Sequence, residues 1–272
     1  MDIDAALIER ARGGERAALD QLVRATKDMV FNLAIRMLGS PSDAEDATQE
    51  ILIRIVTHLG SFRGESSFRT WAYRVASNHL LTTRKRGAEL RADSFDALEE
   101  RLANNLTAGD PPADDKLLVR EAKLICTTTM LACLDRDHRL AYILGEIFDL
   151  ASDEGAAILE ISPEAFRKRL SRARDRMSEF MGKQCGIVNA ASACRCAKQA
   201  GHAVKAGYLD AKKLEWAALG CVKEGRPERV ADLDTVGRAI EVFRSSPEFI
   251  APESLVRGIQ RALDAGSSDL LH

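Results

Sequence analysis

The sequence predicts an all-α fold, in which two small helical domains are joined by a flexible linker and followed by a helical C-terminal extension. Apolar residues recur at steps of three and four along most of the 272 residues, which is the period of a helix. Aromatic residues make up only 5% of the chain, and the alternating β-branched runs typical of strands are absent. This length leaves room for about two domains of roughly 100–200 residues each.

The composition, 46% hydrophobic and 29% charged, is typical of a soluble globular protein. The sequence contains no apolar run near the roughly 20 residues that a membrane-spanning helix needs. Its first 20 residues are rich in charge and do not resemble a secretory signal. We therefore expect a cytoplasmic protein with no membrane span.

The first predicted domain, residues 1–86, begins with two apolar stripes, at residues 19–26 and 30–38, which end at Gly39-Ser40-Pro41. A new helix is expected from Asp43, because acidic side chains in a first turn complement the helix dipole. Its apolar side runs through Ala47, Ile51 and Ile55. A loop at residues 62–67 precedes another helix over residues 68–84.

Residues 87–116 are predicted to form an acidic linker. They carry three basic and eight acidic residues. Gly109 and the Pro111-Pro112 pair also interrupt any helix there. Only a short amphipathic stretch, at residues 95–106, suggests a helix.

The second domain, residues 117–181, contains a predicted helix-turn-helix. A short helix over residues 152–159 is followed by a turn at Glu160 and Ile161. A well-capped helix follows, since Ser162 can accept from free backbone N–H groups and Pro163 suits the first helical position. Gly155 weakens the first of these helices.

The second helix of this motif is basic, with six basic and two acidic residues between Ser162 and Arg176. Phe166, Leu170 and Ala173 share its apolar face, which leaves the basic side chains outside. A basic second helix after a tight turn is what reading of the DNA major groove requires. A solvated basic face on an ordinary helical bundle is the alternative.

Two segments of the first domain, DAEDATQE at residues 43–50 and FRGESSFRTWAYRVASN at residues 62–78, resemble region 2 of bacterial RNA polymerase sigma factors. They are most similar to the extracytoplasmic-function group, whose members have two sigma domains and a linker. The helix-turn-helix resembles region 4 of the same family, in the expected order. The resemblance covers residues 5–181.

The resemblance implies a sigma factor that binds core RNA polymerase and directs it to promoters, with no catalytic role and no required cofactor. The implied partners are the polymerase, at its β′ clamp and β flap, promoter DNA, and an anti-sigma protein. The side chains matched to clamp binding form an acidic, hydrogen-bonding face suited to basic partners; they are Asp43, Glu45, Asp46, Gln49 and Glu50. Charge complementarity at the helix start would explain Asp43 and Glu45, but less naturally Glu50.

The resemblance also implies two DNA-binding surfaces. Melting a promoter requires stacking surfaces and cations along the freed strand. The residues matched to this role in the first domain are Ser66, Ser67, Phe68, Arg69, Trp71, Arg74, Asn78, Arg84, Lys85 and Arg86. Trp71 and Tyr73 could equally belong to the core. In the helix-turn-helix the matched residues are Arg167, Lys168, Ser171 and Arg172, whereas Arg169 is expected to lie over the domain surface.

The extension, residues 182–272, opens with Cys185, Cys194, Cys196 and His202. Three thiolates and an imidazole could bind zinc, although the spacing is not a strong zinc signature. The cysteines could instead act as a redox switch beside Arg195 or simply pack. Cys126 and Cys133, seven residues apart on one predicted helix face, are interpreted as core residues.

Residues 234–265 predict two short amphipathic helices, which cannot bury much apolar area alone. We expect them to pack on a sigma domain and to regulate its access to polymerase or DNA. Two other functions compete with that of a sigma factor. One is a stand-alone helix-turn-helix regulator, and the other is a metal- or redox-sensing variant. The acidic face at residues 43–50 favours the sigma factor, because a stand-alone regulator has no need of it.

Overall fold

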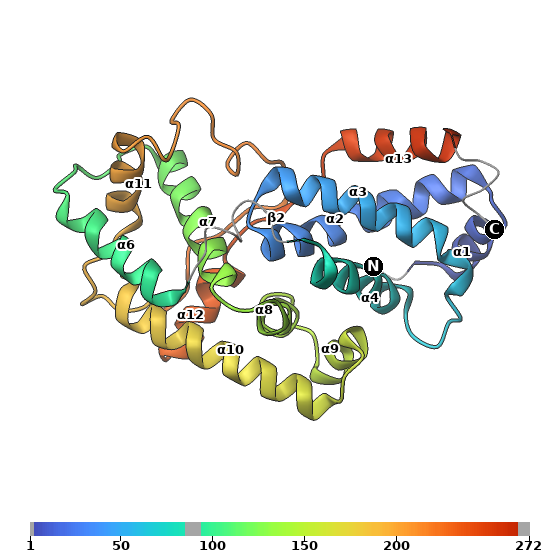
Figure 1. Ribbon diagram of the computed structural model, residues 1–272, viewed down its shortest axis with the longest axis horizontal. Helices are drawn as coiled ribbons and strands as arrows, with labels where there is room; N and C mark the ends of the chain where they lie inside the picture. The colour runs from blue at the N-terminus through green and yellow to red at the C-terminus, as the bar shows by residue number, and fades with distance from the viewer. Residues whose placement is uncertain (1–2, 85–93, 266–272) are drawn as a thin grey trace.

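The computed structural model describes residues 3–84 and 94–265, and within them it confirms the all-α prediction. Strands in the described ranges amount to one short antiparallel pair, β1 (Cys221–Lys223) and β2 (Glu248–Phe249). None of the described helices is long and apolar enough to span a membrane. Figure 1 shows two helical groups side by side, with the C-terminal segment running across both.

The N-terminal bundle is built around a long central helix, α2, which packs against α1, α3 and α4. Gly39 ends α2 in the left-handed conformation, at φ 67°. The next helix begins at Pro41, two residues before the predicted start, because a proline fits the first helical turn and the Ser40 hydroxyl accepts from the Asp43 amide. The elements of this bundle are α1 (Ala5–Arg12), α2 (Arg16–Leu38), α3 (Pro41–Thr57), the 3₁₀ turn η1 (Leu59–Ser61) and α4 (Phe68–Thr82).

The helix-turn-helix has the predicted form. Glu160, at φ 54°, ends the first helix, and the Ser162 hydroxyl accepts from the Ala165 amide at 3.1 Å to cap the second. This second helix continues to Gln184, beyond its predicted basic stretch. The elements of this block are α7 (Lys116–Ala132), α8 (Arg136–Tyr142), the π-helical turn η2 (Ile143–Ile147), α9 (Ser152–Leu159) and α10 (Pro163–Gln184).

Gly155 has a packing role in this motif. A Cβ added there would lie 2.3 Å from the Phe166 ring, and Phe166 is fully buried. The missing side chain therefore lets α9 approach α10 closely. Gly155 has a low helix propensity, but the contact between the two helices requires it.

Part of the acidic segment is held in place. The helix α6 (Phe95–Thr107) matches the predicted amphipathic stretch and buries Leu98 and Leu102. Asp110 accepts from His202 at 2.8 Å and also pairs with Lys205. The described part, residues 94–116, is thus tied to the extension and differs from the expected flexible linker.

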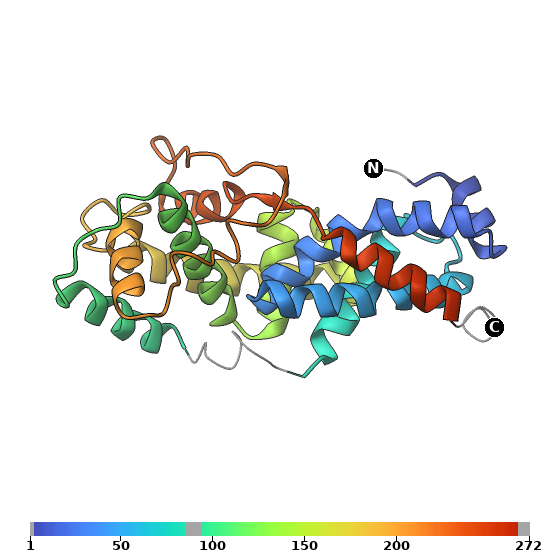
Figure 2. The same cartoon turned by 90° about the horizontal axis from the view of Figure 1, so that it is seen from above.

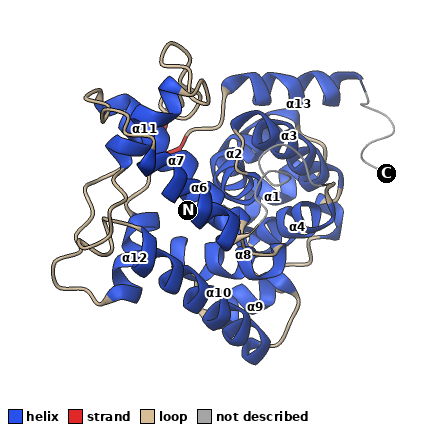
Figure 3. Cartoon of the chain, turned by 60° about the vertical axis from the view of Figure 1, so that its left-hand side comes forward, coloured by secondary structure: helices blue, strands red, loops and turns tan. Residues whose placement is uncertain are grey.

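The C-terminal segment packs on both helical groups. Its helices are α11 (Cys196–Lys205), α12 (Thr235–Arg244) and α13 (Glu253–Ala265), of which the last two correspond to the predicted pair. α11 packs on α7, α12 on α10, and α13 on α2 and α3. Figures 2 and 3 show α13 lying along the N-terminal bundle while α11 and α12 lie against the other block.

Glu121 on α7 anchors the loop between α11 and β1. Its carboxylate, 1% exposed, accepts from the backbone amides of Glu215, Trp216 and Ala217 at 2.7–3.1 Å. Three consecutive amides aimed at one buried carboxylate satisfy its charge without a cation. The extension is therefore joined to the second helical block by a specific polar contact as well as by apolar packing.

The two helical blocks also dock against each other. Helix α4 packs on α9, and α8 approaches α2. Arg139 of α8 is 2% exposed and donates to the carbonyls of Leu131 and Leu134 at 2.9 Å and to that of Met37 in the N-terminal bundle. Because a buried guanidinium needs such acceptors, this contact fixes how the blocks meet.

Candidate functional site

The acidic face of α3 is the first candidate surface. Asp46 and Glu50 are exposed, whereas Asp43, Glu45 and Gln49 are partly buried. Partial burial, followed by the neighbouring Asp46 charge, raises the pKa of Glu45. The helix thus presents carboxylates to solvent along several turns, beyond the first turn that dipole complementarity alone would explain.

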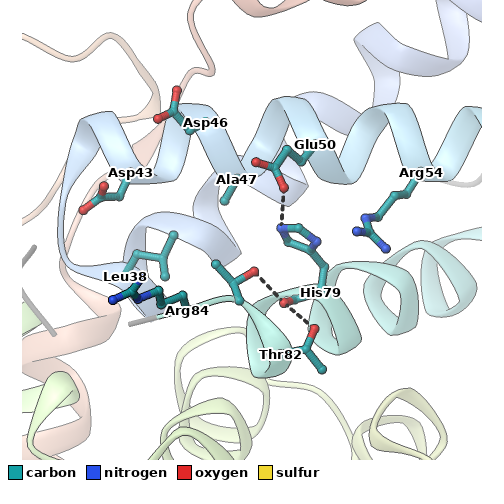
Figure 4. A pocket seen from close by; sticks show the side chains of 10 residues that line it. Leu38, Asp43, Asp46, Ala47, Glu50, Arg54, His79, Thr82 and Arg84 are labelled. Carbon is teal, nitrogen blue, oxygen red and sulfur yellow. Dashed lines mark hydrogen bonds and ion pairs between the residues drawn. The ribbon is translucent and has the colours of Figure 1, made fainter. Parts of the chain in front are cut away.

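A recess of about 260 Å³ separates this face from the end of α4 (Figure 4). Asp43, Asp46 and Glu50 line it from α3, and His79 and Arg84 from α4 and the residues that follow it. The α3 carboxylates therefore lie across the opening from the Arg84 guanidinium and the His79 imidazole. The recess is lined by Leu38, Asp43, Asp46, Ala47, Glu50, Arg54, His79, Thr82, Thr83 and Arg84.

His79 is the most unusual group in this recess. The residue is 7% exposed, and its Nε2 atom has no hydrogen-bond partner although it lies 3.5 Å from a Glu50 carboxylate oxygen. Burial, and then the Arg54 charge, lower the pKa of His79, while Glu50 opposes the shift. The imidazole is therefore favoured in its neutral form, and the contact with Glu50 is not an ion pair at pH 7.

The loop before α4 is supported by an aromatic cluster. Phe62, Phe68 and Trp71 lie with ring centroids 5.5–5.6 Å apart, and all three are buried. Phe68 and Trp71 thus lie in the core in this arrangement and present no face to DNA. Ser67 caps α4 through a 3.0 Å contact with the Thr70 amide, and Ser66 is partly buried.

The polar side chains of α4 face the second helical block. Arg74 donates to the Ala157 carbonyl at 3.2 Å and lies 3.7 Å from Glu160, and Asn78 donates to Glu160 at 3.4 Å. Two residues matched to DNA binding are therefore hydrogen-bonded to α9 and its cap, while Asn78 stays exposed and Arg74 partly exposed. Arg69 is exposed over the Tyr73 ring, at 5.6 Å.

Arg84 is exposed beside the recess. Lys85 and Arg86 lie outside the described residues. The cationic run after α4 is therefore represented in the structure by its first member alone.

Helix α10 presents the predicted basic face to solvent. Arg167, Lys168, Ser171 and Arg172 are all exposed, while Phe166, Leu170 and Ala173 are buried beneath them. Lys168 pairs with Glu164 at 2.8 Å, a contact between exposed groups that DNA phosphates could replace at little cost. The sequence-predicted face is thus intact and accessible.

Two other arginines of α10 are held by acidic partners. Arg169 pairs with Asp137 at 2.8 Å, over the domain surface as predicted. Arg174, expected on the outside, instead donates to the nearly buried carboxylate of Glu146 on η2. A buried carboxylate requires a cation or several donors. The sequence does not indicate that Glu146 is buried, so its pairing with Arg174 could not be predicted.

The four residues proposed to bind zinc do not form a metal site. Cys185 and Cys194 pair across an isolated β-bridge and line a cavity of about 90 Å³ together with Cys196 and Cys126. His202 lies elsewhere, at 2.8 Å from Asp110. Within residues 3–84 and 94–265 no three histidine, cysteine or acidic side chains are placed to share an ion.

Burial raises the pKa of the Cys126, Cys194 and Cys196 thiols, to about 12 for Cys196. Thiols held in the protonated form are poor metal ligands and poor nucleophiles. Zinc is therefore unsupported, and the packing interpretation fits the cavity. Cys126 lies within the second block as expected, although it borders the cavity instead of filling the core.

An acidic face on α3, an arginine-bearing helix beside it and an exposed helix-turn-helix are features typical of the class of transcription initiation factors. The comparisons with known proteins agree. Sigma-70 region 2 matches residues 22–89, and Sigma-70 region 4 matches residues 124–177.

Two curated relatives illustrate the similarity. The ECF RNA polymerase sigma-E factor of Escherichia coli is 32% identical over 176 residues, which cover 63% of this chain and 91% of the relative. The RNA polymerase sigma-H factor of Pseudomonas aeruginosa is 28% identical over 182 residues, covering 65% of this chain and 93% of the relative. Among solved structures, CnrH in complex with the cytosolic domain of CnrY matches with a TM-score of 0.46 and 23% identity, over 65% of this chain and 95% of CnrH.

The chain belongs to the extracytoplasmic-function group of RNA polymerase sigma factors. Its function is that of the family, promoter-specific initiation with RNA polymerase, and it is not an enzyme. Neither the stand-alone regulator nor the metal- or redox-sensing variant is supported.

Proposed function

We propose that this sigma factor docks on the polymerase clamp through the acidic face of α3 and reads promoter DNA through α10 and α4. The polymerase-binding site is inferred from the exposure of Asp46 and Glu50 on a helix that is otherwise packed into the bundle. Carboxylates fixed on a rigid helix suit a basic partner, because they lose little conformational entropy when the partner binds. Since polymerase is the partner, we also infer that the chain works in the cytoplasm.

The promoter-reading part of the proposal rests on α10. Its four exposed polar residues, Arg167, Lys168, Ser171 and Arg172, lie in the first half of the helix, where a recognition helix contacts base edges. Arginine can pair with guanine in two hydrogen bonds, and lysine neutralises phosphate. An adjacent β flap contact and an anti-sigma partner, both implied by the family resemblance, stay predictions.

The second DNA surface needs a change of arrangement. Ser66, Ser67, Arg69 and Arg84 are at least partly accessible, whereas Arg74 and Asn78, although not buried, are engaged by the Ala157 carbonyl and by Glu160. Phe68 and Trp71 would support the loop from beneath. We infer that α4 and α9 separate when the two domains bind their promoter elements.

Run-off transcription with purified core polymerase tests this function. The charge reversals Asp46→Lys and Glu50→Lys should each reduce transcript yield and core binding strongly, because they place a cation against a basic partner. Glu100→Lys, a reversal at an exposed position of α6, is the matched control and should behave like the wild type. Transcription that is normal with both α3 variants would contradict the proposed docking face.

A further inference from the structure

The segment at residues 247–260, here called the strap, runs along α2 and α3 near the end of the described chain (Figure 1). Polar side chains of α2 form hydrogen bonds with its backbone. Asn32 donates to the Phe249 carbonyl at 2.7 Å and accepts from the Phe249 amide at 3.0 Å. Arg36 donates to the Pro247 carbonyl at 3.1 Å. Asn32 and Arg36 are both 7% exposed.

The same pattern continues one turn earlier on α2. Asp28 accepts from the Ala251 amide at 2.8 Å, and Lys27 donates to the Ala251 carbonyl at 3.1 Å. Glu253, at the start of α13, pairs with Arg24 at 3.0 Å and with Lys27 at 3.5 Å. Alternate strap residues are thus bound through their backbone groups, as in the docking of an extended peptide.

Helix α13 then packs its apolar face onto the bundle. Leu255, Val256 and Ile259 are at most 4% exposed, and the helix contacts both α2 and α3. Gly258 lies against the Gln49 side chain, which a Cβ at that position would approach to 3.3 Å. Gln49 belongs to the face proposed to dock on polymerase.

A docked helix excludes other partners from the same flank, because packed helices need interaxial distances of 8–10 Å. Helix α13 therefore occupies space that a polymerase helix approaching the Gln49 side of α3 would need. Since the strap is part of the same chain, its local concentration is on the order of millimolar. Polymerase must displace it to use that flank.

The strap is also linked to the second helical block. Helix α12, immediately before it, packs on α10, and Arg244 at its end donates to Asp149 at 2.6 Å and to the Glu146 carbonyl at 2.5 Å. One continuous segment thus spans from the helix-turn-helix block to α3. It holds the two blocks in the arrangement in which α9 and Glu160 engage Arg74 and Asn78.

We propose that the C-terminal segment is an intramolecular inhibitor, in which the strap occupies one flank of the polymerase-docking helix and ties the helix-turn-helix block over α4. This inference rests on the proposed function, because it needs α3 to be the docking face. The inhibitory segment consists of an extended backbone followed by an amphipathic helix, and the Asp28–Arg36 side of α2 binds it.

The test compares the full-length wild type with the double variant Val256→Asp, Ile259→Asp, which should release α13 by placing two carboxylates in an apolar interface. Arg257→Ala, an exposed change on the same helix, is the matched control. Core-polymerase affinity and run-off transcription at limiting sigma should both rise in the released variant, by about tenfold or more. The control should match the wild type.

Two further measurements keep the test decisive. Limited proteolysis should cut the released variant within residues 247–265 while residues 3–84 stay protected, which shows that the bundle is folded. A synthetic peptide of residues 247–265, added to the released variant, should restore weak polymerase binding. Equal or weaker polymerase binding by the folded released variant would overturn the inference. If neither the wild type nor the released variant binds core at all, the proposed function fails instead.

Discussion

At the scale of single residues, small and buried groups determine the geometry of this sigma factor. Gly155 permits close contact between α9 and Phe166, and the buried carboxylate of Glu146 is paired with Arg174. Neither role is visible in the sequence, because a glycine and a glutamate at these positions have many equivalent local interpretations. The Ser162 cap was predictable, since its role is local.

Gly155→Ala should destabilise the protein by about 1–3 kcal/mol, the usual cost of overpacking. This exceeds the gain of ~1 kcal/mol expected from replacing glycine in a helix. Urea denaturation measures the free energy of unfolding, with Gly60→Ala, which has nothing within 4 Å, as the control. A Gly155→Ala protein as stable as the control would show that Phe166 can move.

His79 should make stability depend on pH. Burial lowers the pKa of His79 in the folded state, so the unfolded chain binds the extra proton first and the folded state loses stability as pH falls below about 6.5. His79→Gln, which cannot titrate, should show a smaller loss between pH 7 and pH 5. Denaturation curves at both pH values measure the difference, and parallel losses in the two proteins would contradict it.

At the scale of elements, α10 is the helix whose geometry was most predictable. Its cap, its apolar side and its basic face all follow from local spacing, and the structure leaves the predicted residues exposed. The aromatic residues of α4 were ambiguous, and burial resolves their position in this arrangement. The two helices differ in predictability because the polar and apolar faces of a helix follow from its own residue spacing, whereas the burial of one side chain depends on the elements that pack against it.

Arg167→Ala or Lys168→Ala should each lower promoter affinity of the holoenzyme by ~1–3 kcal/mol if the side chain reads a base. A lysine that contacts phosphate alone should instead weaken binding of all sequences and reduce its salt dependence. Lys183→Ala, exposed on the same helix but beyond its first half, is the control. Unchanged affinity and sequence preference in both variants would remove α10 from the interface.

Glu121→Ala should release the loop at residues 215–217 from α7. The substitution leaves buried backbone amides without their acceptor, at a cost of about 3 kcal/mol or more. Faster proteolysis between α11 and β1, with the N-terminal bundle still protected, is the expected result. Glu99→Ala, exposed on α6, should leave the cleavage pattern unchanged, and an unchanged pattern for Glu121→Ala would show that apolar packing alone holds the loop.

At the scale of the whole molecule, the two sigma blocks form one closed body with the C-terminal segment across both (Figure 1). The contacts that close it are specific, since Arg139 and Arg136 of α8 donate to carbonyls of the N-terminal bundle. If the proposal holds, this arrangement disfavours promoter binding by the free protein, because Arg74 and Asn78 are engaged by the second block until the blocks separate.

Locking the blocks together should therefore abolish transcription. A short bismaleimide joining cysteines introduced by Thr83→Cys and Arg136→Cys would bridge α4 and α8, where Arg136 contacts the Thr83 carbonyl. The cross-linked protein should lose run-off activity, and the two single variants treated in the same way should keep it. Full activity of a protein shown by mass spectrometry to be cross-linked would rule out the need for separation.

The sequence alone determined the helical fold class, the capped helix-turn-helix, the acidic helix and the family, because each depends on residues within a few turns of one another. The tertiary structure alone decided that α9 and Glu160 engage Arg74 and Asn78, that His202 pairs with Asp110 and not with a metal, and that the strap lies on α2 and α3. These contacts join residues about 80 to 240 positions apart, and pairing over such distances leaves no periodic signal in the sequence.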